Sequence, residues 1–217
     1  MSLAPVSEPS FANFFAGPNA QVVKAVEAVV AGDADSLHIW GPAGVGRSHL
    51  LRAAEAHAIR LGRPAAWVGR DDPERSMQQP LALVIADDVD RLDAREQLDA
   101  FALIDGARLR GARVLTAART PAHELTLRED LRTRLAQSSS LHLAPLSDQD
   151  KRQAIAAHAA RRALPLGGET VEYIIARVDR DMGSLMRVLE SLEETSLREH
   201  RAINVPLARE VLQGLGF

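Results

Sequence analysis

A chain of 217 residues is long enough for one full domain and a small companion, which excludes a large multidomain machine. Hydrophobic residues make up 46% and charged residues 25%, typical of soluble globular chains, which argues against disorder and coiled coil. The net charge of −3 offers no global basic field for nucleic acid, and the lack of cysteine excludes disulfides, thiol catalysis and cysteine-ligated zinc.

The N-terminal residues predict a flexible lead-in over residues 1–10, because they are polar and contain two prolines. No apolar run approaches the roughly 20 residues that a membrane span needs, and no basic region precedes an apolar stretch. We therefore expect a cytoplasmic protein with no membrane partner.

Helical and strand patterns alternate through the first two thirds of the chain. Apolar residues at helical spacing predict a helix from about residue 20 to 31. Short apolar runs predict strands at residues 37–40, 65–68, 81–86, 113–117 and 140–143. Further helices are expected at residues 47–61, 94–109 and 127–136. Since alternating strands and helices form βαβ units, residues 11–145 are predicted to be an α/β domain with a parallel sheet.

The strand patterns end after Pro145, and only helical patterns follow. Ser147 is a good N-cap for the first of them. The predicted helices lie at residues 148–162, 169–178, 181–200 and 205–215. Residues 146–217 are therefore predicted to form a small helical domain.

A phosphate-binding loop is predicted between the first strand and the helix after it. Residues 41–48 fit GxxxxGK followed by Ser or Thr, with Arg47 in place of lysine. The glycines let backbone N–H groups turn toward a phosphate, the helix adds its dipole, and Ser48 would hold Mg²⁺. We expect ADP or ATP to bind here with Mg²⁺. The predicted nucleotide-binding residues are Gly41, Pro42, Ala43, Gly44, Val45, Gly46, Arg47, Ser48, His49 and Phe15.

Arg47 has two interpretations. Arginine keeps the positive charge but replaces a compact ammonium with a wide planar fork. Only Lys24 and Lys151 are lysines among the 26 basic residues, so the substitution fits drift. It equally fits a site that holds nucleotide and turns it over slowly.

Asp87 and Asp88 follow the most apolar predicted strand, at the sheet edge where open α/β sheets bind ligands. This is the pattern of a Walker B motif. Asp87 would hold Mg²⁺, and Asp88 would act on an attacking water as general base. The alternative is an Asp-rich turn that caps a helix.

The phosphate loop, Asp87-Asp88-Val89 and Leu131-Arg132-Thr133-Arg134-Leu135 together resemble the AAA+ domain of the bacterial replication initiator DnaA. The loop form Gly-Arg-Ser-His-Leu-Leu and the segment at residues 145–151 are similar to the Hda family of DnaA regulators. The resemblance implies a P-loop AAA+ domain with a C-terminal helical lid. It also implies a nucleotide-binding regulator that makes DnaA hydrolyse its ATP and so prevents re-initiation of chromosomal replication.

The resemblance assigns Arg134 as an arginine finger supplied to the partner's nucleotide, with a surface arginine on an Arg-rich helix as the alternative. Such a finger predicts association with a DnaA-type initiator or self-association as a homodimer. We expect no direct sequence-specific DNA binding. The family also binds the sliding clamp through a glutamine-containing peptide, which residues 1–9 lack. The expected location is the bacterial cytoplasm, at the nucleoid through partners.

Two positions depart from the family pattern and point away from efficient intrinsic hydrolysis. Gly183 stands where the lid usually carries the sensor-2 arginine, for which Arg180 and Arg187 are neighbouring substitutes. After the fourth strand, Ala118 leaves only Thr116 or Arg119 to probe the γ-phosphate. Two alternatives to the trans-activator stay open, which are a helicase-loader type adaptor and a P-loop ATPase acting on its own substrate.

Overall fold

The computed structural model describes residues 8–71, 76, 78, 80–178 and 181–217. Backbone contacts divide them into two compact units, Pro9–Ala144 and Pro145–Phe217, each described here by itself. The segment before Glu8, where the sequence shows no clamp-binding peptide, lies outside the described residues. No described helix is long and apolar enough to cross a membrane.

A parallel sheet forms the centre of the first unit. In the described residues its strand order is β2-β3-β4-β1-β5. The strands are β1 (Leu37–Trp40), β2 (Ala65–Trp67), β3 (Leu83–Ala86), β4 (Arg113–Ala118) and β5 (Ser139–His142). All four positions of β3 are buried, as expected for an inner parallel strand covered on both faces. The α/β fold with a parallel sheet that the sequence predicts is confirmed.

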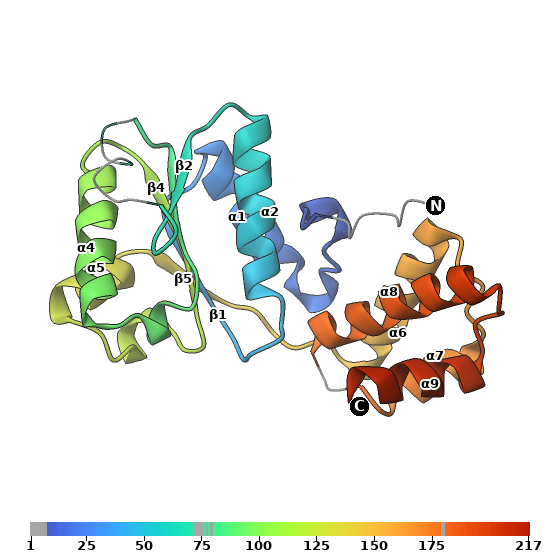
Figure 1. Cartoon of the computed structure of the whole chain (residues 1–217). Helices are drawn as coiled ribbons and strands as arrows, with labels where there is room; N and C mark the ends of the chain where they lie inside the picture. The colour runs from blue at the N-terminus through green and yellow to red at the C-terminus, as the bar shows by residue number, and fades with distance from the viewer. Residues whose placement is uncertain (1–7, 72–75, 77, 79, 179–180) are drawn as a thin grey trace. The chain divides into compact units, whose positions relative to one another are not determined.

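Helices cover both faces of this sheet (Figure 1). α1 (Ala20–Ala31) and α2 (Arg47–Arg60) pack on one face, and α4 (Ala94–Arg108) and α5 (Glu129–Ala136) on the other. α1 follows the predicted pattern, with Val22, Val26, Val29 and Val30 buried. It ends where Gly32 takes a left-handed backbone with φ +88°. The result is one apolar core on each side of the sheet.

The second unit contains α6 (Asp148–Arg162), α7 (Gly168–Ile175), α8 (Met182–Glu199) and α9 (Val205–Leu215). Ser147 caps α6 by accepting a hydrogen bond from the Asp150 backbone N–H at 3.1 Å. Apolar residues of one α8 face, including Leu185, Leu189 and Leu192, form a core with α7 and α9. This helical unit is the predicted lid.

His38 joins β1, the strand that leads into residues 41–46, to the neighbouring strand β4. It is fully buried on β1, in register with Thr116 of β4. The Nε2–H donates to the Thr120 carbonyl at 3.1 Å, so Nδ1 accepts from the Thr116 hydroxyl at 2.8 Å. Burial lowers the pKa of His38, because it disfavours the charged imidazolium.

We expect His38 to make stability depend on pH. Above about pH 6.5, the ordinary imidazole value, both states are neutral and the contribution vanishes. As the pH falls below that value, the unfolded state binds a proton that the native state excludes, so the unfolding free energy falls. Chemical denaturation from pH 7.5 to 5 measures the slope. His38→Gln should flatten it, whereas His123→Gln, at an exposed position, should leave it unchanged.

Candidate functional site

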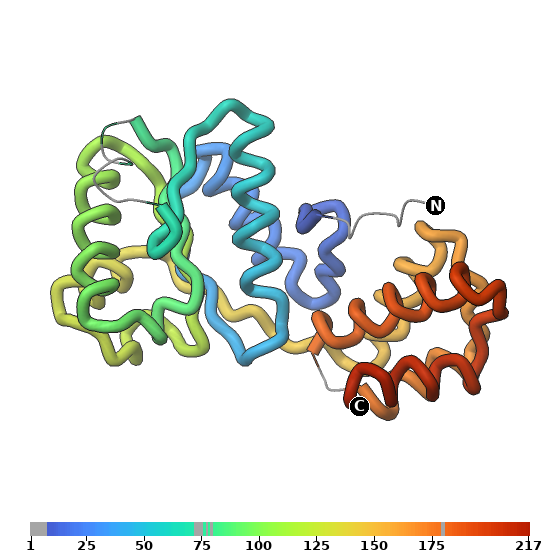
Figure 2. Tube along the Cα trace, viewed as in Figure 1, coloured from blue at the N-terminus to red at the C-terminus, as the bar shows by residue number. Residues whose placement is uncertain are grey.

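The chain runs from β1 directly through residues 41–46 into α2 (Figure 2). Gly44 and Gly46 have φ values of +79° and +103°, which side chains rarely adopt. A Cβ on Gly46 would lie 2.8 Å from the Phe14 ring. Residues 42–44 are exposed at the tip of the loop. The backbone therefore turns as a phosphate loop must, with its tip open to a ligand.

Gly41 is tied into the sheet. Its N–H donates to the Ala118 carbonyl at 3.2 Å, and a Cβ at this position would collide with the Leu143 carbonyl oxygen. Since a backbone carbonyl cannot rotate away, Gly41→Ala should lower the unfolding free energy by about 1–3 kcal/mol. Urea unfolding measures the loss. Gly214→Ala, where a Cβ meets open space, is the control and should not destabilise the protein.

Arg47 links the phosphate loop to the end of β3. Its side chain is only 7% exposed, and Nη2 donates to Asp88 Oδ1 at 2.9 Å. The other terminal nitrogen, Nη1, is buried without a hydrogen-bond partner in the described part of the chain. A buried charged donor without an acceptor is costly, so this nitrogen fits a site made to receive an anion. The phosphate of a nucleotide fits that description.

Asp87 and Asp88 lie together directly after β3. The Asp88 N–H donates to Asp87 Oδ1 at 2.9 Å, and Asp88 takes a left-handed backbone with φ 44°. Arg91 lies 4.0 Å from the second oxygen of Asp88. The carboxylate that a general base would use is therefore held between two arginines.

Ser48 and Asp87, the predicted Mg²⁺ residues, are both half-buried. No group of three or more His, Cys, Asp or Glu in the described residues could hold a metal ion. Mg²⁺ typically takes few protein ligands and completes its shell with water and phosphate oxygens. These two residues fit Mg²⁺ that arrives with a nucleotide.

Residues 11–15, which follow the predicted lead-in, pack on α2 next to the loop. Phe14 lies against Gly46 and 5.4 Å from the His49 ring, and His49 Nε2 lies 3.0 Å from Asn13 Oδ1. Burial lowers the pKa of His49, as it does that of His38. Phe15, the predicted nucleotide residue, is half-buried in the same segment. Phe14 is the aromatic ring at the loop itself, which the sequence did not single out from its neighbours.

The two candidate γ-phosphate probes lie in different surroundings. Thr116 is fully buried and its hydroxyl bonds His38. Arg119 is exposed and lies 3.8 Å from Asp90. Only Arg119 is accessible from solvent.

Gly183 lies in the first turn of α8, where a Cβ would meet only Asp181 Oδ1, at 3.1 Å. Of the two substitutes for the missing arginine, Arg187 donates to Ser184 Oγ at 2.9 Å. Arg180 lies outside the described residues.

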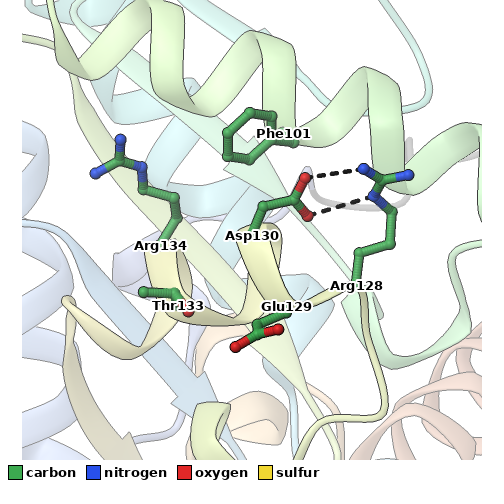
Figure 3. A pocket seen from close by; sticks show the side chains of 6 residues that line it. All are labelled: Phe101, Arg128, Glu129, Asp130, Thr133 and Arg134. Atoms are coloured by element: carbon green, nitrogen blue, oxygen red, sulfur yellow. Dashed lines mark hydrogen bonds and ion pairs between the residues drawn. The ribbon is translucent and has the colours of Figure 1, made fainter.

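Arg134 lines an open cavity of about 770 Å³ on the face covered by α4 and α5. Its Nη2 contacts Asp105 Oδ1 of α4 at 2.7 Å, and its side chain is 38% exposed. Figure 3 shows Arg134 extending away from the Arg128–Asp130 ion pair at the other side of the opening. The cavity is lined by Phe101, Arg128, Glu129, Asp130, Thr133 and Arg134. An arginine on an open rim is available to a second molecule.

Comparisons with known proteins bear on both units. Residues 148–212 match the family model "Hda, lid domain". The structure resembles domain III of the Thermotoga maritima replication initiation protein DnaA, with a TM-score of 0.81 and 17% identity over 99% of this chain and 98% of that one. Residues 148–212 therefore match the lid domain of the Hda family, and the chain has the fold of DnaA domain III.

Two further solved structures share this fold. AMPPCP-bound DnaA from Aquifex aeolicus matches with a TM-score of 0.70 and 19% identity, over 90% of this chain and 68% of that one. A Thermotoga maritima RuvB mutant matches with a TM-score of 0.67 and 17% identity, over 96% and 73%.

Proposed function

We propose that this protein is a regulator of the Hda type, which binds ADP or ATP with Mg²⁺ at residues 41–48 and supplies Arg134 to a nucleotide held by a DnaA-type initiator. The initiator then hydrolyses its ATP and cannot restart replication. The observation that carries the proposal is the position of Arg134, a partly exposed arginine on the rim of an open cavity. A positive fork at the γ-phosphate stabilises charge that develops in the transition state.

Nucleotide binding is supported by the positive φ angles of Gly44 and Gly46 and by the unpaired, buried Nη1 of Arg47. AMPPCP is bound in the structurally similar Aquifex aeolicus DnaA. When bound, Mg²⁺ would neutralise phosphate charge, with Ser48 and Asp87 as its protein ligands.

Slow turnover of its own nucleotide is supported by the Arg47–Asp88 ion pair. One oxygen of Asp88, the predicted general base, accepts a hydrogen bond from Arg47. Gly183 and Ala118 provide no sensor side chain at the two positions where the family pattern expects one. These features favour a trans-activator over an ATPase that acts for itself.

The proposal is tested by prebinding radiolabelled ATP to the cognate initiator and following its hydrolysis on clamp-loaded DNA, with and without this protein. Conversion should accelerate, while the protein alone turns over ATP negligibly. No acceleration, or fast turnover by the protein alone, would overturn the proposal. Binding to the replicative helicase without any effect on the initiator would instead favour the adaptor.

A further inference from the structure

We propose that Asp105 is a positioning residue that holds the Arg134 guanidinium ready for a partner's phosphate. This inference rests on the proposed function and adds a second residue to it. Asp105 lies on α4 and Arg134 on α5, so the pair joins two helices of the same face. Asp105 itself is 26% exposed, and its Oδ1 lies 2.7 Å from Arg134 Nη2.

α4 contacts Arg134 both at its guanidinium and at its backbone carbonyl. Asp105 takes the guanidinium, and Arg108, one turn further along the same helix, donates from Nη1 to the Arg134 carbonyl at 3.2 Å. A long arginine side chain loses much rotamer freedom when it binds a ligand. Because α4 already restricts this side chain, part of that entropy is lost before a partner arrives, as in any preorganised site.

The contact with Asp105 leaves most N–H donors of the Arg134 guanidinium unused. A guanidinium has five N–H donors in a planar fork, and the contact with Asp105 uses one terminal nitrogen, Nη2. The N–H groups of Nη1 and Nε are therefore left for phosphate oxygens. The cation of Arg108 also lies next to this residue, and it offsets the negative charge that Asp105 would otherwise bring near a phosphate.

The opposite role for the same pair is sequestration, in which Asp105 competes with the phosphate for Arg134. The two roles predict effects of opposite sign. If Asp105 positions the finger, Asp105→Ala should lower the rate constant of stimulated hydrolysis about fivefold, the effect of a partly exposed ion pair. Asp105→Glu, which keeps the carboxylate, should recover most of the loss. Asp99→Ala removes the same charge from an exposed position of α4 and is the matched control.

The first measurement is single-turnover hydrolysis of ATP by the initiator at saturating regulator, which isolates the rate constant from affinity. The second is ¹⁵N NMR of the arginine guanidinium groups in the full chain, with the Arg134 signal identified by its loss in Arg134→Lys. Asp105→Ala should speed rotation of that guanidinium, and Asp99→Ala should not.

An unchanged or higher rate in Asp105→Ala, or a guanidinium signal insensitive to Asp105, would overturn the positioning role. Failure of the proposed function looks different. In that case Arg134→Ala itself would leave stimulation intact, while the NMR signal would still report whether Asp105 restrains Arg134. The two ideas can therefore fail separately.

Discussion

Arg134→Ala is expected to reduce stimulated hydrolysis by the initiator about 10³-fold, the scale of a lost arginine finger. The fold and nucleotide binding should be unchanged, because Arg134 is partly exposed and its two partners, Asp105 and Arg108, are partly exposed residues of α4. The loss should appear in the rate constant rather than in binding to the initiator. The initiator's single-turnover rate, measured at saturating regulator, checks this.

The matched control for Arg134 is Arg132→Ala. Arg132 is exposed two residues earlier on the same helix, and the substitution removes the same charge. It should leave the stimulated rate within about twofold of the wild type, because a surface charge acts weakly through solvent. Equal losses in the two variants would show that α5 acts through its net charge and would rule out a finger at Arg134.

Arg47→Ala should have the largest effect on nucleotide affinity, a loss of about 100-fold. The substitution removes the cation at the phosphate loop and leaves the Asp88 carboxylate without its 2.9 Å partner, facing the incoming phosphates. Titration with a fluorescent ADP measures the dissociation constant. Arg91→Ala removes the exposed arginine on the other side of Asp88 and should change affinity little. An unchanged affinity in Arg47→Ala would contradict a phosphate role for this loop.

Arg47→Lys separates the two interpretations of this residue. A lysine keeps the charge, but its compact ammonium does not offer the fork that holds Asp88. If Arg47 restrains Asp88, the variant should bind nucleotide and hydrolyse it faster than the wild type. If the arginine reflects drift, the intrinsic rate stays the same. A steady-state phosphate-release assay distinguishes the two.

The local sequence pattern was sufficient to predict the strands and helices in their order along the chain. β3 was predicted because an inner parallel strand is apolar at every position, and α6 because Ser147 caps it. The ends were less accurate. β3 starts at Leu83 rather than Leu81, since the N–H groups of Ala82 and Leu83 both bond the Pro64 carbonyl ahead of β2. Such contacts depend on the neighbouring strand, which the local sequence does not specify.

For a related reason, the sequence could not predict which site residues contact one another. Arg47 and Asp88 were each singled out, but they are 41 residues apart, and only the strand order brings them together. Asp105 was not singled out, because an acidic residue in a helix has many ordinary roles. Its significance comes from the packing of α4 on α5, which places it 2.7 Å from Arg134.

The left-handed backbone of Asp88 limits which residues can occupy this position. At a φ of 44°, glycine, asparagine and aspartate are favoured, whereas alanine and β-branched residues are strained. Substitutions of Asp88 can therefore change the charge of the side chain without changing the backbone turn. Asp88→Asn keeps the turn and a hydrogen-bond acceptor for Arg47 but removes the negative charge, and Asp88→Gly keeps only the turn. In a saturation library at position 88, we thus expect the backbone conformation to decide which variants fold. Among the variants that fold, the chemistry of the side chain should decide which are active.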